Sequence, residues 1–149
     1  MATEDADPRF AELDAWPLAA AIEAMWDGQM AAVAAVRAAL PQITAATEAA
    51  AERLISSGRL IYAGAGTSGR VAVQDGTELG PTFNWPPERL LYVLAGGDHA
   101  ILNSVEGAED DAEEGALQMD AAEVGSDDVV IGVAASGRTP FTTAHIERA

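Results

Sequence analysis

The chain has 149 residues with no cysteine, and its 24 acidic against 8 basic residues give a formal net charge of −16 at pH 7. The length is that of one domain with a sizeable core, and the absence of cysteine excludes disulfides, thiolate nucleophiles and Cys-based metal sites. The acidic excess argues against nucleic acid and anionic membranes as partners, and because every one of the 8 is arginine, lysine-based catalysis and a Walker A lysine are excluded as well.

The first 15 residues are predicted to form an N-terminal arm. They are polar and include Pro8. The N-terminus lacks the apolar segment of a signal peptide, and no stretch of the chain reaches the ~18 consecutive apolar residues of a membrane span. A cytoplasmic location is therefore expected.

Residues 16–57 are predicted to form a helical segment. Between Leu18 and Leu54, apolar side chains recur at spacings of three and four residues, which is typical of amphipathic helices. Pro41 is expected to divide the segment into two helices, because proline lacks the backbone N–H that the helix interior requires. The chain has three tryptophans, Trp16, Trp26 and Trp85. They are expected to pack against the sheet or against a partner subunit.

The remaining residues, 58–149, are predicted to form one domain with a parallel sheet. Short apolar runs indicate buried strands at 59–63, 90–95 and 128–134, and each is followed by small residues and then by helical composition. Alternating strands and helices predict the α/β class, as a three-layer, doubly wound parallel sheet preceded by the N-terminal helices.

The turn after the first predicted strand has the pattern G-x-G-x-x-G over residues 64–69. A dinucleotide site would also need an acidic residue at the end of the second strand, but that strand ends in Ala-Gly-Gly, with Asp98 as the only late candidate. Free N–H groups at a helix start, two hydroxyls and the nearby Arg70 instead suit a phosphate.

The turn after the third predicted strand has the same chemistry, with Pro140 suited to the first helical turn. Because the carboxyl ends of parallel strands share one edge, both turns are expected to converge on one phosphate. The alternative is that their hydroxyls are ordinary N-caps. The predicted phosphate and sugar ligands are Gly66, Thr67, Ser68, Ser136, Gly137 and Thr139.

Three glutamates are candidates for acid–base chemistry. Glu78 is predicted at the end of the helix after the first turn, where a carboxylate opposes the helix dipole at a cost of 0.3–1 kcal/mol, which hints at a function. Glu106 and Glu109 belong to an acidic cluster, and a partly buried carboxylate there would have a raised pKa suited to proton transfer. The alternative for the cluster is a solvated charge run. The two histidines, His99 and His145, are isolated, so no metal site is expected.

Four blocks in order closely resemble the N-acetylmuramic acid 6-phosphate etherases, which belong to the sugar isomerase (SIS) domain superfamily. The blocks are residues 60–70, 95–97, 105–110 and 134–140, and the resemblance also covers a degenerate arm with Thr3 and Glu4. It implies a cofactor-free lyase of peptidoglycan recycling that removes D-lactate from the 3-ether of the sugar phosphate and leaves N-acetylglucosamine 6-phosphate. It also implies a sugar phosphate as the partner, and a homodimer is expected.

By position, the family's glutamate that protonates the departing lactate matches Glu78, and a second catalytic carboxylate matches Glu109. Glu78 ends the helix that starts at the phosphate turn, while Glu109 follows the second strand. The two are therefore expected to approach the sugar from different sides at the carboxyl edge of the sheet. Glu106 lies one helical turn away from Glu109 and is an alternative for the base that takes the C2 proton.

Members of that family continue through further strands and a helical C-terminal region, whereas this chain stops inside the helix after Pro140. The sheet is therefore expected to be incomplete, as in a piece of a longer protein or a fold that a partner completes. A non-catalytic sugar-phosphate sensor and an inactive fragment stay open as alternatives to the lyase. Retention of Glu78 and Glu109 favours the lyase, because a sensor needs the phosphate turns but not the carboxylates.

Overall fold

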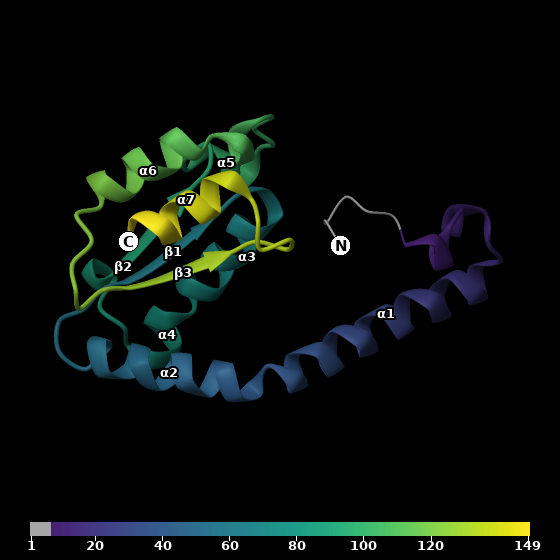
Figure 1. Cartoon of the computed structure of the whole chain (residues 1–149), viewed down its shortest axis with the longest axis horizontal. Coiled ribbons are helices and arrows are strands. Elements are labelled where there is room, and N and C mark those ends of the chain that lie inside the picture. Colours follow the sequence, from purple (N-terminus) through teal and green to yellow (C-terminus); the bar gives the residue numbers. More distant parts are fainter. Residues whose placement is uncertain (1–6) are drawn as a thin grey trace. The chain divides into compact units, whose positions relative to one another are not determined.

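A computed structural model of the chain describes residues 7–149 (Figure 1). The chain divides into two compact units, residues 1–49 and 50–149. Thr3 and Glu4, which belong to the predicted arm, lie outside the described residues. The arm, helical-segment and domain boundaries after residues 15 and 57 stay predictions.

The first unit is helical. Two short 3-10 turns, η1 (Pro8–Phe10) and η2 (Leu13–Ala15), precede the helix α1 (Leu18–Ala38), and α2 (Leu40–Leu54) continues into the second unit. The predicted division at Pro41 is confirmed, since the break falls at Ala39 and Pro41 lies in the first turn of α2, where a missing N–H costs little.

The apolar side chains of α1 are exposed. Trp26 is 64% exposed, and Leu18, Ile22, Met25 and Met30 range from 49% to 76%. The expectation that Trp26 packs against the sheet or against a partner subunit stays a prediction. Within residues 7–149 no single helix has the length and composition of a membrane span, and α1 and α2 meet that test only as a pair bent by 60°.

The second unit contains a three-stranded parallel sheet in the order β2-β1-β3. Its strands are β1 (Leu60–Gly64), β2 (Leu90–Leu94) and β3 (Val129–Val133). In register, Gly64 lies opposite Leu94 on one side and Val133 on the other. The predicted strands and their parallel direction are thus confirmed, and the segments that follow all three strands leave the sheet at one edge.

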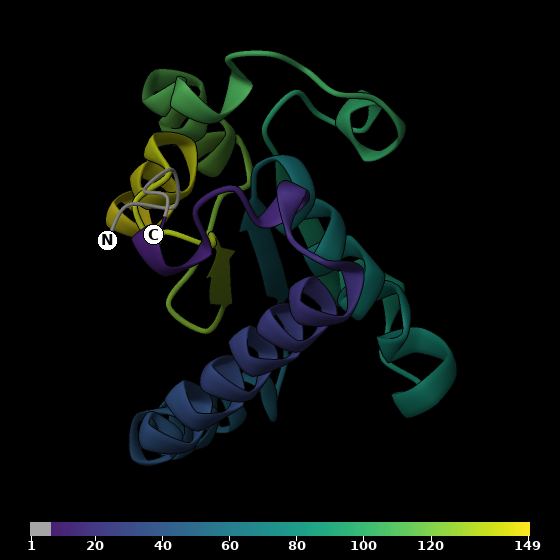
Figure 2. The same cartoon turned by 90° about the vertical axis from the view of Figure 1, so that its right-hand side faces the viewer.

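Helices cover both faces of this sheet, which confirms the predicted three-layer α/β class (Figures 1 and 2). One face is covered by α3 (Gly66–Thr77), followed by the short α4 (Leu79–Phe83), and the other by α7 (Pro140–Arg148), against which α6 (Ala112–Ala121) packs. The short elements η3 (Pro87–Arg89), α5 (His99–Leu102) and η4 (Ala108–Asp110) connect them.

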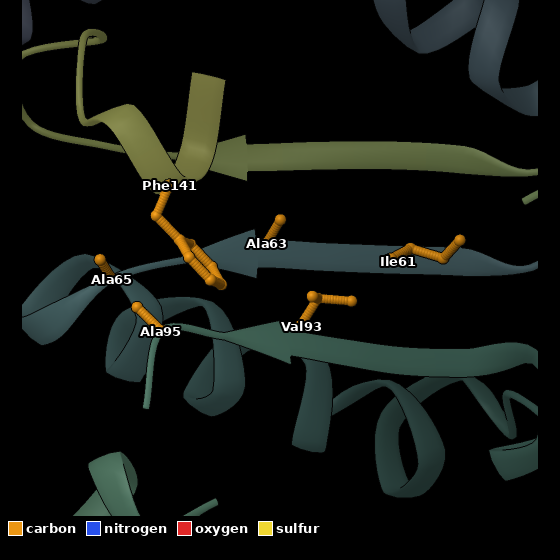
Figure 3. Packing of buried hydrophobic residues seen from close by; sticks show 6 residues of the cluster. All are labelled: Ile61, Ala63, Ala65, Val93, Ala95 and Phe141. Atoms are coloured by element: carbon orange, nitrogen blue, oxygen red, sulfur yellow. The ribbon is translucent and has the colours of Figure 1, made fainter. Parts of the chain in front are cut away.

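Each face of the sheet has its own hydrophobic cluster. On the α7 side, the side chain of Phe141 extends from the start of α7 over the end of β1, and it clusters with Ile61 and Ala63 of β1 and Val93 of β2 (Figure 3). The α3 side buries Leu60, Tyr62 and Ala72, with Trp85 packed against them. The expectation that Trp85 packs on the sheet is therefore confirmed.

The prediction that all three strands are buried is wrong for β3. β1 is buried along its whole length, whereas Ile131 in β3 is 39% exposed and Gly132 is exposed as well. The physical reason is position, because β1 lies between two neighbours, whereas β3 is an edge strand, as is β2, whose first three residues are only partly buried. An apolar run of this length does not reveal which place a strand takes in the sheet.

At the amino-terminal ends of the strands, an ion pair between Arg59 and Asp128 joins the starts of β1 and β3. Asp128 accepts hydrogen bonds from the backbone N–H of Arg59 (2.7 Å), from Nη2 of Arg59 (2.6 Å) and from the N–H of Gly125 (2.9 Å). Burial raises the pKa of Asp128, but the hydrogen bonds from Arg59 and Gly125 together outweigh it and lower the pKa to about 2.

Candidate functional site

The carboxyl edge of the sheet is where the chain changes faces. β1 leads into α3 on one face, while β2 leads toward α6 and β3 into α7 on the other. In open α/β sheets, ligands bind in the crevice at such a switch point, because the departing segments separate there. The loops after β1, β2 and β3 are therefore the part of this fold that can form a site.

The first predicted phosphate turn starts α3. Gly66 has φ +53°, in the left-handed region that favours glycine, and a Cβ at Gly69 would lie 3.0 Å from the carbonyl oxygen of Gly64. Glycine at these positions lets the helix start close against β1. The N-cap residue, Ala65, supplies no side-chain hydrogen bond, so no side chain of the cap satisfies the first N–H groups of α3.

A pocket of about 140 Å³ lies beside this turn. Gly66 and Arg70 line it from α3, Ala95 from just after β2, Ala100 from α5, and residues 103–109 from the segment that follows α5 and includes the start of η4. The structure thus brings together Gly66 of the predicted phosphate turn and Glu109, one of the two predicted catalytic residues. Glu106, the alternative base, lines the same pocket.

Arg70 connects the two walls of this pocket. Its Nη1 donates to the carbonyl oxygens of Ala100 (2.9 Å) and Asn103 (3.5 Å), and its Nη2 donates to Oγ1 of Thr67 (3.5 Å). These bonds tie the first turn of α3 to the loop that carries Glu106 and Glu109. Sequence reasoning placed Arg70 near the phosphate turn but had no signal for its partners, which lie 30 and 33 residues away.

The two glutamates in the pocket are exposed. Glu109 lies in η4, which starts immediately after Gly107, and Glu106 precedes that glycine. The partial burial that would favour proton transfer at neutral pH is therefore not met in this chain. Asn103 and Ser104 also line the pocket and were not predicted, because isolated polar residues in a loop have no pattern.

The second predicted phosphate turn precedes α7. Pro140 is the first residue of that helix, as predicted. Oγ of Ser136 accepts from the N–H of Arg138 (3.1 Å) within the turn, and Thr139 makes no side-chain capping bond. Gly137 lines a different hollow, together with Thr142 and residue 146 of α7. Both turns lie at one edge of the sheet, but they line separate pockets.

Glu78 lies at the other end of α3. The 12 residues of this helix span about 18 Å, and Glu78 follows the last of them. The next residue, Leu79, packs into the cluster that contains Leu60, at the start of β1. Glu78 is exposed and does not line the pocket of Glu109. Glu78 is absent from this pocket because α3 runs antiparallel to the strands, and the expectation that Glu78 and Glu109 approach the sugar from different sides stays a prediction.

The described part of the chain, residues 7–149, contains no group of three or more histidine, aspartate or glutamate side chains arranged to hold a metal ion. The polar groups that line the pocket are the guanidinium of Arg70, the carboxylates of Glu106 and Glu109, the amide of Asn103 and the hydroxyl of Ser104.

Comparison with known proteins places these features in a family. The family model of the glucokinase regulatory protein N-terminal SIS domain matches residues 42–149. The chain is 54% identical over 139 residues to an N-acetylmuramic acid 6-phosphate etherase of Deinococcus radiodurans, covering 93% of this chain and 46% of that protein. It is 46% identical over 149 residues to one from Rubrobacter xylanophilus, covering 100% and 50%. The chain thus spans about half the length of the curated relatives it matches.

Proposed function

Because the chain belongs to the N-acetylmuramic acid 6-phosphate etherase family, and has a SIS domain of the glucokinase regulatory protein type, we propose that it acts on a sugar phosphate as a lyase. The substrate in this proposal is N-acetylmuramic acid 6-phosphate, and the products are D-lactate and N-acetylglucosamine 6-phosphate. The observation that carries the proposal is that Glu109 lines the same pocket as Gly66 of the first phosphate turn.

The reaction requires two proton transfers. A base must take the weakly acidic C2 proton, and an acid must protonate the departing lactate oxygen before water adds at C3. Glu109 lines the pocket and is proposed as the base that takes the C2 proton, with Glu106, which lines the same pocket, as the alternative. The resemblance assigns the acid to Glu78. Within one chain Glu78 lies a helix length away from the start of α3, where the pocket is, so in this proposal the acid is the Glu78 of a second copy of the chain.

The phosphate is assigned to the turns at the carboxyl edge. Gly66, Thr67 and Ser68 contribute the uncapped start of α3 and two hydroxyls. Ser136, Gly137 and Thr139 are assigned to the phosphate as well, from the turn at the same edge of the sheet that lines a separate pocket in this structure. Helix N-termini favour anions through their free N–H groups and the helix dipole. Anchoring the phosphate away from the reacting bonds orients the sugar for proton transfer.

A homodimer is part of the proposal. The exposed apolar side chains along α1 form a stripe of the kind that other surfaces cover. Light scattering after size exclusion is expected to give twice the 15.4 kDa of one chain. A mass of one chain at all concentrations contradicts the dimer, and with it the supply of Glu78 from a second copy.

The test is D-lactate release from N-acetylmuramic acid 6-phosphate, followed by a coupled D-lactate dehydrogenase assay. Glu109→Gln is expected to lower the rate by about 10²–10⁴-fold, the usual contribution of a general acid or base. Glu113→Gln is the matched control, because Glu113 is exposed in the first turn of α6 and does not line the pocket. Equal rates for Glu109→Gln and the control contradict the assignment.

A sugar-phosphate sensor is the second candidate, and the exposure of both pocket glutamates is the observation that favours it. Binding of N-acetylglucosamine 6-phosphate without any lactate release from the substrate identifies a sensor. If the chain neither binds the sugar phosphate nor releases lactate, it is an inactive fragment of the family fold.

A further inference from the structure

We infer that Arg70 is a ligand-binding residue of the pocket and that its guanidinium holds the phosphate group of the sugar phosphate. The inference rests on the proposed function and adds a residue to the site. Arg70 lines the same pocket as Gly66 and Glu109, and it lies one helical turn along α3 from Thr67.

The hydrogen bonds of Arg70 fix its side chain but leave it able to bind. Nη1 donates to the carbonyl oxygens of Ala100 and Asn103, and Nη2 donates to Oγ1 of Thr67. A guanidinium has five N–H donors, so these three bonds leave the Nε–H and one Nη2–H. Nε and Nη2 lie along one edge of the guanidinium plane, and such an edge can bind a phosphate or carboxylate with two parallel hydrogen bonds.

The charge of Arg70 has no acidic partner in these bonds. All three acceptors are neutral, whereas Arg59 and Arg148 each form an ion pair with an aspartate. Arg70 contributes the positive charge of a pocket to which Glu106 and Glu109 contribute negative charge. In a chain of net charge −16, Arg70 is the cationic side chain in the lining of this pocket, and it offsets the charge of the two carboxylates for an incoming dianionic phosphate.

The substrate has two anionic groups, the phosphate and the lactyl carboxylate, and both fit the chemistry of a guanidinium edge. The contact between Arg70 and Thr67 favours the phosphate, because Thr67 belongs to the turn assigned to that group. Arg70 and the start of α3 then bind the same phosphate from two sides.

The experiment measures binding of two esters by calorimetry: N-acetylglucosamine 6-phosphate, a dianion near pH 7.5, and its 6-sulfate, a monoanion. We expect Arg70→Gln to weaken binding of the phosphate by about 10- to 100-fold and binding of the sulfate by clearly less, so that the preference for the dianion falls. Arg70→Lys keeps the charge but not the planar edge and is expected to recover only part of the loss. Arg37→Gln on α1 removes the same charge from an exposed site and is expected to change neither affinity.

Four outcomes overturn the inference. Unchanged affinities in Arg70→Gln exclude a contact, and an equal loss for both esters shows that Arg70 acts by ordering the loop. N-acetylmuramic acid, which has the carboxylate but no phosphate, is measured as a third ligand. If Arg70→Gln weakens the binding of this ligand alone, Arg70 binds the carboxylate instead. A wild-type chain that binds neither ester overturns the proposed function as well, whereas the first three leave that function standing. If Arg70→Gln fails to fold by circular dichroism, the comparison of the wild type with Arg70→Lys decides.

Discussion

Replacement of Asp128 by asparagine is expected to destabilise the sheet domain by about 2–3 kcal/mol at pH 7. The side chain of Asp128 is only 8% exposed and accepts four hydrogen bonds, three from Arg59 and one from Gly125. Asparagine keeps the shape but loses the charge. Its amide also turns donors toward the N–H groups of Arg59 or Gly125, because each carboxylate oxygen of Asp128 accepts from one of them.

The magnitude follows from the pKa of Asp128. It is lowered from 3.8 to about 2 in the folded chain, and this difference corresponds to about 2.5 kcal/mol of stability. A carboxyl group with a lowered folded-state pKa contributes stability above its unfolded value, and the contribution disappears as the pH falls through the folded value. It is therefore fully present at pH 7, about half is lost by pH 3, and nearly all is lost below pH 2.

The assay is urea denaturation followed by circular dichroism at pH 7, 5 and 3, for the wild type and Asp128→Asn. The difference in free energy of unfolding should be largest at pH 7 and shrink at pH 3. Asp120→Asn is the matched control, because Asp120 pairs with Arg148 where both side chains are about half exposed, and its loss should cost clearly less than the loss of Asp128. If Asp128→Asn costs no more than the control, or its cost is the same at pH 3 as at pH 7, the reasoning is refuted.

Two further predictions concern the buried layers. Burial lowers the pKa of His145, so the unfolded chain binds its proton more readily, and stability is expected to fall as the pH drops below about 6.5. Melting temperatures at pH 7.5 and 5.5 test this, and a drop that is equally large in His145→Leu contradicts it. A Cβ at Gly76 would lie 2.6 Å from the hydroxyl oxygen of Tyr92, so Gly76→Ala should cost about 1–3 kcal/mol in urea denaturation. Tyr92→Phe removes a buried hydroxyl that has no hydrogen-bond partner, so by itself it should cost little, and combined with Gly76→Ala it should recover part of the stability lost. A Gly76→Ala variant as stable as the wild type rules out the close contact.

Local features of the sequence predicted the strands and the class of the fold. The apolar runs at 59–63, 90–95 and 128–134 match β1, β2 and β3 to within one residue at each end, because apolar composition and flanking glycines act over a few neighbouring residues. The division at Pro41 and the start of α7 at Pro140 were predictable for the same reason, since proline constrains its own backbone.

The position of each strand in the sheet, and the set of residues that line the pocket, depended on contacts between residues far apart in the sequence. β3 has the same kind of apolar run as β1, yet only the strand order leaves it exposed at an edge. The pairing of Arg59 with Asp128 spans 69 residues, and no local pattern marks it.

The two predicted catalytic glutamates, Glu78 and Glu109, show most directly which contacts a local sequence pattern does not reveal. The sequence by itself determined that Glu78 ends a helix starting at the phosphate turn, and that Glu109 follows the second strand. Only the tertiary structure decided that Glu109 shares a pocket with Gly66 and Arg70, whereas Glu78 does not. The reason is that a crossover helix runs back along the sheet, so its length carries Glu78 about 18 Å away from the edge where the pocket forms.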